Sequence, residues 1–338
     1  MFKLKLKLSA FAMSYLSSGE RVREIVEAQP TKHSTNLNFV TVSGIKVAAI
    51  SLPLKHYRNI PEYVSVINER IAQAVQSGAQ LIAFPELCGL LPLTMAPGFG
   101  GIYNDIIHLE ASDDNYRQAF MAVCEAGLGF CGEIYLNTFS RLAQAYGVMI
   151  ASGSIFCWED GSIKNRSFLF DEKGRVVGTQ DKLFLSPLEK LLGVVSGEKV
   201  NVIKTKLGGI GLFTVDDLKS FEPFVIGSAL GLDIAVAAGS INDTNASMAR
   251  YRASESNSCI VVPVYCEGGE FGKSFVHPAA IYAPLSSTRS KDGIICSAEP
   301  CEAAVARVDV TKIKSSFDVY TADKNTDFYR ENYVLCKG

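Results

Sequence analysis

The residues best suited to chemistry are charged side chains that follow apolar segments of strand length. Two carboxylates beside a lysine can move protons and hold a developing negative charge. Each carboxylate alone is more simply explained as a helix cap or a solvated group. Polar groups gathered at strand ends are the usual layout of α/β active sites, so the set indicates a site. Its members are Glu86, Lys182, Glu189, Asp216 and Asp217.

Two similar strand–helix–strand units are predicted to position these groups. Their elements are a strand at 46–51, a helix from Pro61 to Gly78, a strand at 81–84, then a strand at 210–215, a helix near 218–230 and a strand at 234–238. The strands are continuously apolar rather than alternating, so both faces of each sheet should be covered. We therefore expect one α/β domain with two sheets and helices outside them.

The rest of the body supplies further elements and one irregular stretch. The glycine-rich segment 90–132 predicts a long loop or an insertion. The other predicted elements are a helix at 134–146, a strand at 148–152, a hairpin around the turn 171–174, a polar helix at 243–257, a strand at 259–264 and a closing hairpin-like pair at 275–284 and 302–310.

The two ends of the chain differ from this body. We expect an N-terminal extension at 1–43, a domain at 44–315 and a C-terminal tail at 316–338. The extension begins with alternating lysine and leucine and predicts some helix near 21–27 that packs on the body or on a membrane surface. A cleaved signal peptide is the alternative, but its apolar core is short and interrupted by Ser9 and Ser14.

Composition excludes several functions. The 338 residues carry a net charge of −2, so there is no basic excess to meet nucleic-acid phosphates. No run approaches ~18 apolar residues, so no integral membrane span is expected. The nine cysteines contain no C-x-x-C pair and the four histidines no i, i+4 pair, which argues against a metal site. Most cysteines lie in apolar runs and are predicted to be reduced, which indicates the cytoplasm.

Several fragments, in order and spacing, resemble the nitrilase superfamily of carbon–nitrogen hydrolases, from about Val47 to Val310. They are 81–87 (LIAFPEL), 165–174 (NRSFLFDEKG), 180–189 (QDKLFLSPLE), 208–217 (GGIGLFTVDD) and 252–255 (RASE). The resemblance implies a four-layer αββα sandwich, a homodimer or higher homo-oligomer, and no metal or organic cofactor.

The resemblance also implies a role for each matching residue. In that family a cysteine thiolate attacks an amide or nitrile carbon, and a thioester is then hydrolysed. By position, Glu86 resembles the general base, Lys182 the lysine that stabilises the developing anion, and Glu189 the second carboxylate. The family's cysteine falls on Val215, which has no lone pair and cannot form a thioester.

Other positions complete this interpretation of the sequence. Phe184 stands where many members have histidine, and Ser256 where asparagine usually follows the glutamate. The residues predicted to contact the ligand are Asp216, Asp217 and Glu222.

Three functions remain open at this point. The first is a pseudoenzyme of the nitrilase superfamily that binds a small amide, carboxylate or amine without covalent catalysis. The second is an active amide hydrolase in which Glu86 activates water, or in which Cys88 or Cys266 serves as the nucleophile. The third is a structural or partner-binding subunit whose charged residues form only salt bridges.

Overall fold

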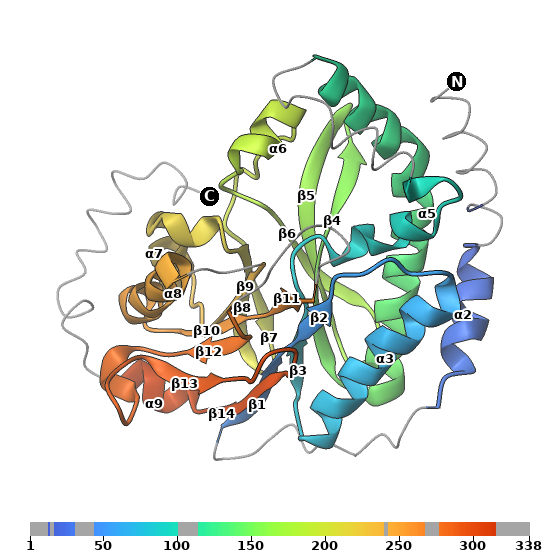
Figure 1. Ribbon diagram of the computed structural model, residues 1–338. Coiled ribbons are helices and arrows are strands. Elements are labelled where there is room, and N and C mark those ends of the chain that lie inside the picture. The colour runs from blue at the N-terminus through green and yellow to red at the C-terminus, as the bar shows by residue number, and fades with distance from the viewer. Residues whose placement is uncertain are drawn as a thin grey trace.

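The computed structural model describes residues 13, 17–30, 44–100, 114–239, 243–267 and 277–315. The predicted C-terminal tail and most of the N-terminal extension lie outside these residues. Two six-stranded mixed sheets dominate the described chain, and a two-stranded sheet lies beside them (Figure 1).

The first sheet has the strand order β14 (Ala304–Val308), β1 (Ile45–Ala49), β3 (Leu81–Ala83), β4 (Met149–Glu159), β5 (Ser162–Phe170) and β6 (Val176–Asp181). The second has the order β13 (Ile294–Ser297), β12 (Ala280–Tyr282), β10 (Cys259–Val262), β9 (Ile234–Ala238), β8 (Gly208–Thr214) and β7 (Val202–Thr205). The small sheet pairs β11 (Val264–Cys266) with β2 (Ser51–Pro53).

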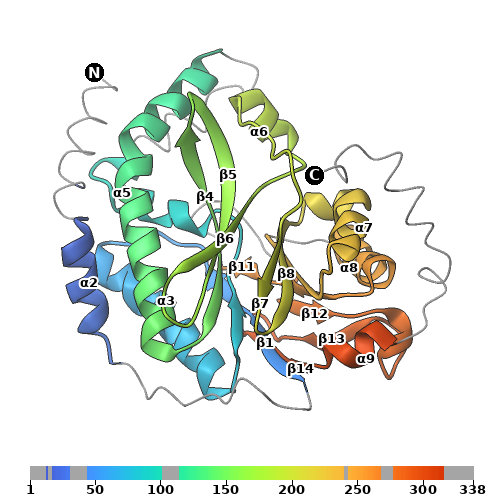
Figure 2. The ribbon, with the colours of Figure 1, turned by 180° about the vertical axis from the view of Figure 1, so that it is seen from behind.

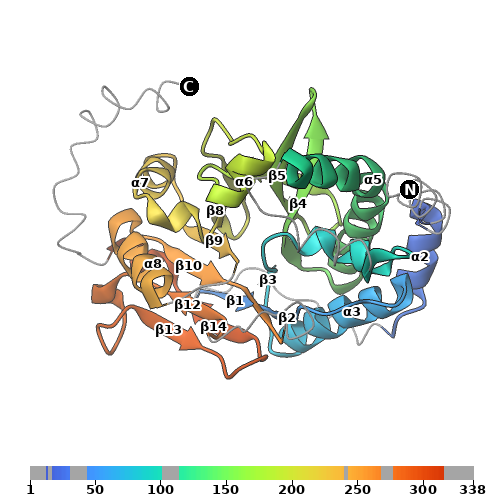
Figure 3. The ribbon, with the colours of Figure 1, turned by 45° about the horizontal axis from the view of Figure 1, so that its top comes forward.

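Helices cover the outer faces of both sheets. The α-helices are α2 (Gly19–Glu27), α3 (Ile60–Gln76), α5 (Asp114–Tyr146), α6 (Pro187–Leu192), α7 (Glu222–Ala229), α8 (Asp243–Ser256) and α9 (Val310–Ser315). The 3-10 helices are Cys88–Met95, Asp217–Lys219 and Leu285–Ser287. Seen from the top, α3 and α5 lie outside the first sheet and α7 and α8 outside the second (Figure 3). The predicted four-layer αββα sandwich is confirmed.

Alternation along the strands explains why this sheet needs cover on both sides. In β3, Leu81 and Ala83 pack in the core between the sheets, whereas Ile82 packs in the core under α3 and α5. Successive side chains of a strand point to opposite faces, so a strand that is apolar at every position requires two apolar neighbours.

Both predicted strand–helix–strand units are present. β1 pairs with β3, and β8 with β9, in parallel. The helix α3 begins as its sequence predicts, because the Asn59 side chain accepts a hydrogen bond from the Glu62 backbone N–H at 2.9 Å and Pro61 follows. It ends just before Gly78, whose φ of +82° is left-handed.

Two sequence-based expectations about this body were wrong. The region predicted as an irregular loop instead carries the 3-10 helix Cys88–Met95 and the first half of α5, which begins at Asp114. The glycines of this helix argue against a helix in the sequence, because glycine is a poor helix former. In the structure Gly127 is required by packing, since a Cβ there would lie 2.4 Å from Leu93 Cδ2. The predicted closing hairpin also fails, since β12 pairs with β10 and β13 whereas β14 pairs with β1 in the other sheet.

The helix α2 packs beside α3 and α5, which Figure 2 shows from behind, as predicted for a helix of the N-terminal extension. Within α5, the stretch Tyr116–Tyr146 is long and apolar enough to cross a membrane. A core helix satisfies the same criterion, and Phe139, Leu142 and Tyr146 at its C-terminal end are fully buried against the first sheet.

Candidate functional site

The ammonium of Lys182 lies at the centre of the site and is almost completely buried. Its Nζ donates hydrogen bonds to Glu86 Oε1 at 2.9 Å, to Glu189 Oε2 at 2.7 Å and to Asp216 Oδ2 at 2.7 Å. Glu86 follows β3 of the first sheet, and Asp216 follows β8 of the second. The structure therefore brings four of the sequence-predicted residues together where the two sheets end.

Asn165 is a fifth member that the sequence analysis missed. Its Nδ2 donates to Glu86 Oε1 and to Glu189 Oε1, both at 2.9 Å, so it bridges the two glutamates. It reaches them because the Lys182 backbone N–H donates to the Asn165 carbonyl at 2.8 Å, which places β5 beside Lys182. We call Lys182, Glu86, Glu189, Asp216 and Asn165 the Lys182 cluster.

Glu189 is positioned by the start of α6. Ser186 and Glu189 form a capping box, in which the Ser186 Oγ accepts from the Glu189 N–H and Glu189 Oε2 accepts from the Ser186 N–H. Pro187 occupies the first helical turn, which suits its fixed φ. One carboxylate thus caps a helix and binds Lys182, so the orientation of Glu189 is fixed from both sides.

Glu86 is held by its backbone. The Tyr265 hydroxyl donates to the Glu86 carbonyl, and the next backbone N–H, that of Leu87, donates to Ser154 Oγ, both at 2.9 Å. Leu87 adopts a left-handed φ of +56°. A Cβ on Gly153 would lie 1.9 Å from the Pro85 carbonyl oxygen, so only glycine allows this strand to pass so close to the Glu86 segment.

Val215 lies beside the free oxygen of Glu86. A Cβ placed on Gly239 would be 2.9 Å from Val215 Cγ2 and 3.1 Å from Glu86 Oε2, so both atoms border the same point. Within the described residues, Oε2 accepts no hydrogen bond, whereas Oε1 accepts two. Thr214, one residue earlier, points elsewhere, because its Oγ1 donates to Asp217 Oδ2.

The other predicted ligand contacts do not join the cluster. Asp217 is fully buried, and its carboxylate accepts from the backbone N–H groups of Leu183, Phe184 and Thr214. It therefore ties the loop after β6 to the end of β8. Glu222 lies in the first turn of α7, and the Ser220 hydroxyl hydrogen-bonds its carboxylate.

Burial and charge set the protonation of the cluster. Burial raises the pKa of Glu86 to about 7, against the opposing pull of Lys182. Burial alone would lower the pKa of Lys182, but the charges of Glu86 and Glu189 and the hydrogen bond that Lys182 donates to Asp216 raise it. Burial opposes ionisation of Asp216 too, yet the hydrogen bonds from Lys182 and Lys219 lower its pKa. Glu86 thus changes charge near neutrality while Lys182 stays cationic.

Neither alternative cysteine faces this cluster. Cys88 is fully buried, its Sγ donates to the Ser152 carbonyl at 2.8 Å, and burial raises its pKa far above the ordinary value. The Tyr265 side chain reaches Glu86, so Cys266, the next residue of β11, points to the opposite face. Both positions disfavour attack on a ligand beside Glu86.

Comparison with known proteins places this geometry in context. The sequence profile of the carbon-nitrogen hydrolase family matches residues 46–288, which contain the whole Lys182 cluster. "Probable hydrolase YhcX" of Bacillus subtilis (strain 168) is 36% identical over 88 residues, which are 26% of this chain and 17% of that protein. "Nitrilase 2" of Arabidopsis thaliana is 26% identical over 185 residues, or 54% of this chain and 51% of that protein. The chain spans about half or less of these curated relatives.

A solved structure extends the similarity over most of the chain. An amidase from Nesterenkonia sp. has a TM-score of 0.59 and 17% sequence identity to this chain, and the match covers 86% of this chain and 97% of the amidase. At this identity the shared feature is the fold, so the predicted sandwich of the nitrilase type is confirmed.

Proposed function

Because the chain belongs to the carbon-nitrogen hydrolase family, we propose that it binds a small amide, amine or carboxylate at the Lys182 cluster without forming a thioester. The observation that supports this proposal is that the side chain of Val215 borders Glu86 Oε2. The resemblance to the family assigns its nucleophile to this position. A solved structure of a mutant of the similar Nesterenkonia sp. amidase shows covalent addition of the acetamide moiety of fluoroacetamide at the active site cysteine. A valine offers no electron pair for such a bond.

The free oxygen of Glu86 favours a ligand that donates a hydrogen bond. Lys182 is saturated by three carboxylates, so it has little capacity left for an anion. Ionised Glu86 instead presents an unused acceptor beside an apolar side chain, which suits the N–H of an amide or amine. The side chains of Glu86 and Asp216 are 13% and 17% exposed, so the cluster is mostly buried but keeps some contact with solvent.

The proposal predicts a pH-dependent affinity, measured by calorimetry with propionamide, propylamine and propionate as probes of equal carbon skeleton. We expect the amide and the amine to bind more tightly as pH rises through about 7, because Glu86 then loses its proton. Glu86→Gln should weaken this binding by ~10–100-fold, the cost of a hydrogen bond to a charged group, and remove the pH dependence. Glu159→Gln, on a partly exposed ion pair away from the Lys182 cluster, is the control.

Tighter binding of propionate as pH falls would contradict the proposal that the ligand donates a hydrogen bond to Glu86. Equal binding to the native chain and to Glu86→Gln would instead support a purely structural role for the cluster. Glu86 also keeps the water-activating hydrolase in view, because a base with a pKa of about 7 is well matched to neutral pH. The predicted homo-oligomer and cytoplasmic location stay predictions.

A further inference from the structure

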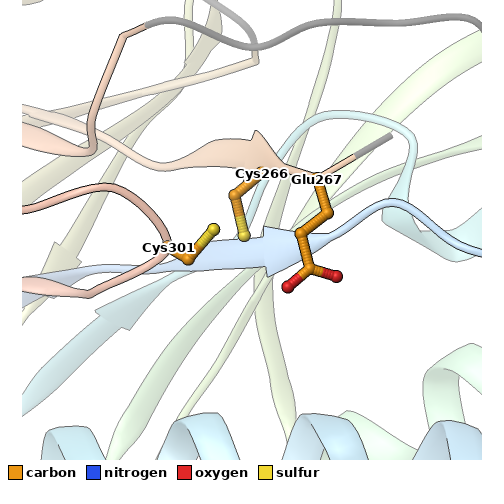
Figure 4. Close-up of side chains that lie close together, drawn as sticks. All are labelled: Cys266, Glu267 and Cys301. Carbon is orange, nitrogen blue, oxygen red and sulfur yellow. The ribbon is translucent and has the colours of Figure 1, made fainter. Parts of the chain in front are cut away.

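A second group of reactive side chains lies away from the Lys182 cluster. Cys266, Glu267 and Cys301 bring two sulfurs and a carboxylate oxygen within 4.8 Å of one another (Figure 4). Cys266 ends β11, Glu267 follows it, and Cys301 belongs to the turn before β14. We call these three residues the Cys266 cluster. The sulfur of Cys266 faces away from Glu86, so the Cys266 cluster is separate from the Lys182 cluster.

Three contacts hold the backbone of the Cys266 cluster in place. Arg70 Nη1 donates to the Cys301 carbonyl at 3.1 Å, and Ser51 Oγ donates to the carbonyl of the next residue at 2.7 Å. The Leu54 N–H donates to the Cys266 carbonyl at 2.9 Å. The ligand atoms are therefore brought together by the fold from distant parts of the sequence.

The backbone around the cluster is also unusual. Glu267 has a φ of +60° and Cys301 a φ of +64°, left-handed values that cost energy for residues other than glycine. Such strain tends to persist at functional sites, where surrounding contacts enforce it. Two of the three ligand residues adopt it, which is an observation independent of the ligand distances.

We propose that the Cys266 cluster binds a thiophilic divalent cation, Zn²⁺ above all, through both sulfurs and the Glu267 carboxylate, with water as the fourth ligand. Tetrahedral zinc with bonds of ~2.3 Å to sulfur and ~2.1 Å to oxygen needs ligand atoms ~3.6–3.8 Å apart. The three ligand atoms already lie within 4.8 Å of one another, so only small movements of the side chains are needed to reach the distances that zinc requires.

Charge balance supports a dication at this place. Two thiolates and one carboxylate carry three negative charges, which the ion and the nearby guanidinium of Arg70 neutralise together. Binding forms two sulfur–metal bonds and releases both thiol protons to solvent, with no change of oxidation state. Because protons compete with the ion for both sulfurs, the affinity for the ion should fall as pH falls.

The test uses the full chain under a metal-free phosphine reductant, with Co²⁺ and Zn²⁺ as probes. Bound Co²⁺ should show the visible bands of a tetrahedral site and near-ultraviolet thiolate charge transfer, and an indicator dye should record two protons released per ion bound. Zn²⁺ should then displace Co²⁺ and abolish both bands without further proton release. Cys301→Ser should lower the affinity at least ~100-fold, since even outer-shell changes cost ~10–100-fold. Cys296→Ser, a half-buried cysteine outside the cluster, should bind as the native chain does.

Glu267→Gln supplies a variant that is safe for folding, because Glu267 is exposed. It should keep the thiolate bands and weaken binding, as loss of one of three ligands requires. Octahedral Co²⁺ spectra, or equal affinities for the native chain, Cys301→Ser and Glu267→Gln, would overturn the proposal. A native chain that binds no metal when reduced would also overturn it, as when peroxide simply oxidises the two thiols to a Cys266–Cys301 disulfide and is itself reduced to water. None of these results bears on the Lys182 cluster.

Discussion

Replacing Val215 by cysteine is expected to give a thiol that iodoacetamide alkylates at least ~10-fold faster near neutral pH than the buried native cysteines. The new sulfur would lie beside Glu86 Oε2, which accepts no other hydrogen bond among the described residues. Glu86 can take the thiol proton once it is ionised, so the rate should rise as pH passes about 7. Peptide-level mass spectrometry measures this rate separately for each cysteine.

Two further variants define what the rate means. Thr214→Cys is the matched control, because the Thr214 side chain points to Asp217 rather than to Glu86, and it should react slowly. The double variant Val215→Cys with Glu86→Gln should lose most of the gain and its pH dependence. If Val215→Cys reacts no faster than Thr214→Cys, residue 215 does not occupy the position of a nucleophile.

Replacing Lys182 by methionine is expected to destabilise the fold by ~3–5 kcal/mol, measured by urea denaturation. Lys182 is 2% exposed in its side chain and compensates three carboxylates. Removing one partner of a buried ion network leaves the others charged and poorly solvated, which costs more than the network contributes. Lys164→Met is the control, since Lys164 forms a partly exposed pair with Glu159 and should cost only ~0–1 kcal/mol.

The cost of Lys182→Met should depend on pH with a definite sign. The pKa of Asp216 is lowered in the folded chain, so this carboxylate contributes stability above its unfolded pKa and loses it as pH falls. Methionine removes the main cause of that lowering. The difference in unfolding free energy between native chain and variant should therefore be largest above about pH 3.8, the ordinary pKa of an aspartate, and shrink in stronger acid. A difference that is small at every pH would show that the ion pairs contribute little to the fold.

The members of the Lys182 cluster differ in how far the sequence predicts them. Glu86, Lys182 and Asp216 follow apolar strands or a hairpin, and strand ends of α/β folds converge, so their proximity follows from the pattern. The contact of Asn165 with the cluster cannot be predicted in this way, because the β5–β6 pairing shifts register between Leu169 and Phe170. Counting outward from the turn therefore assigns Asn165 the wrong partner.

The remaining misses depend on tertiary contacts between distant segments. Asp217 has the same sequence context as Asp216, but the loop after β6 folds over it and supplies its hydrogen-bond donors. Cys266 and Cys301 meet only because β11 lies beside the turn that leads to β14. No local spacing records either contact, so only the folded chain reveals which carboxylate is structural and which cysteines are neighbours.

The most direct test of the central claim is ammonia release from a panel of short aliphatic amides and nitriles, with and without prior treatment by iodoacetamide. The absence of a nucleophile at Val215 predicts no turnover that the thiol reagent can block. The low reactivity expected of Cys88 and the orientation of Cys266 predict the same. Turnover of any of these substrates that iodoacetamide abolishes would contradict the account, because it would require a cysteine that acts at this site.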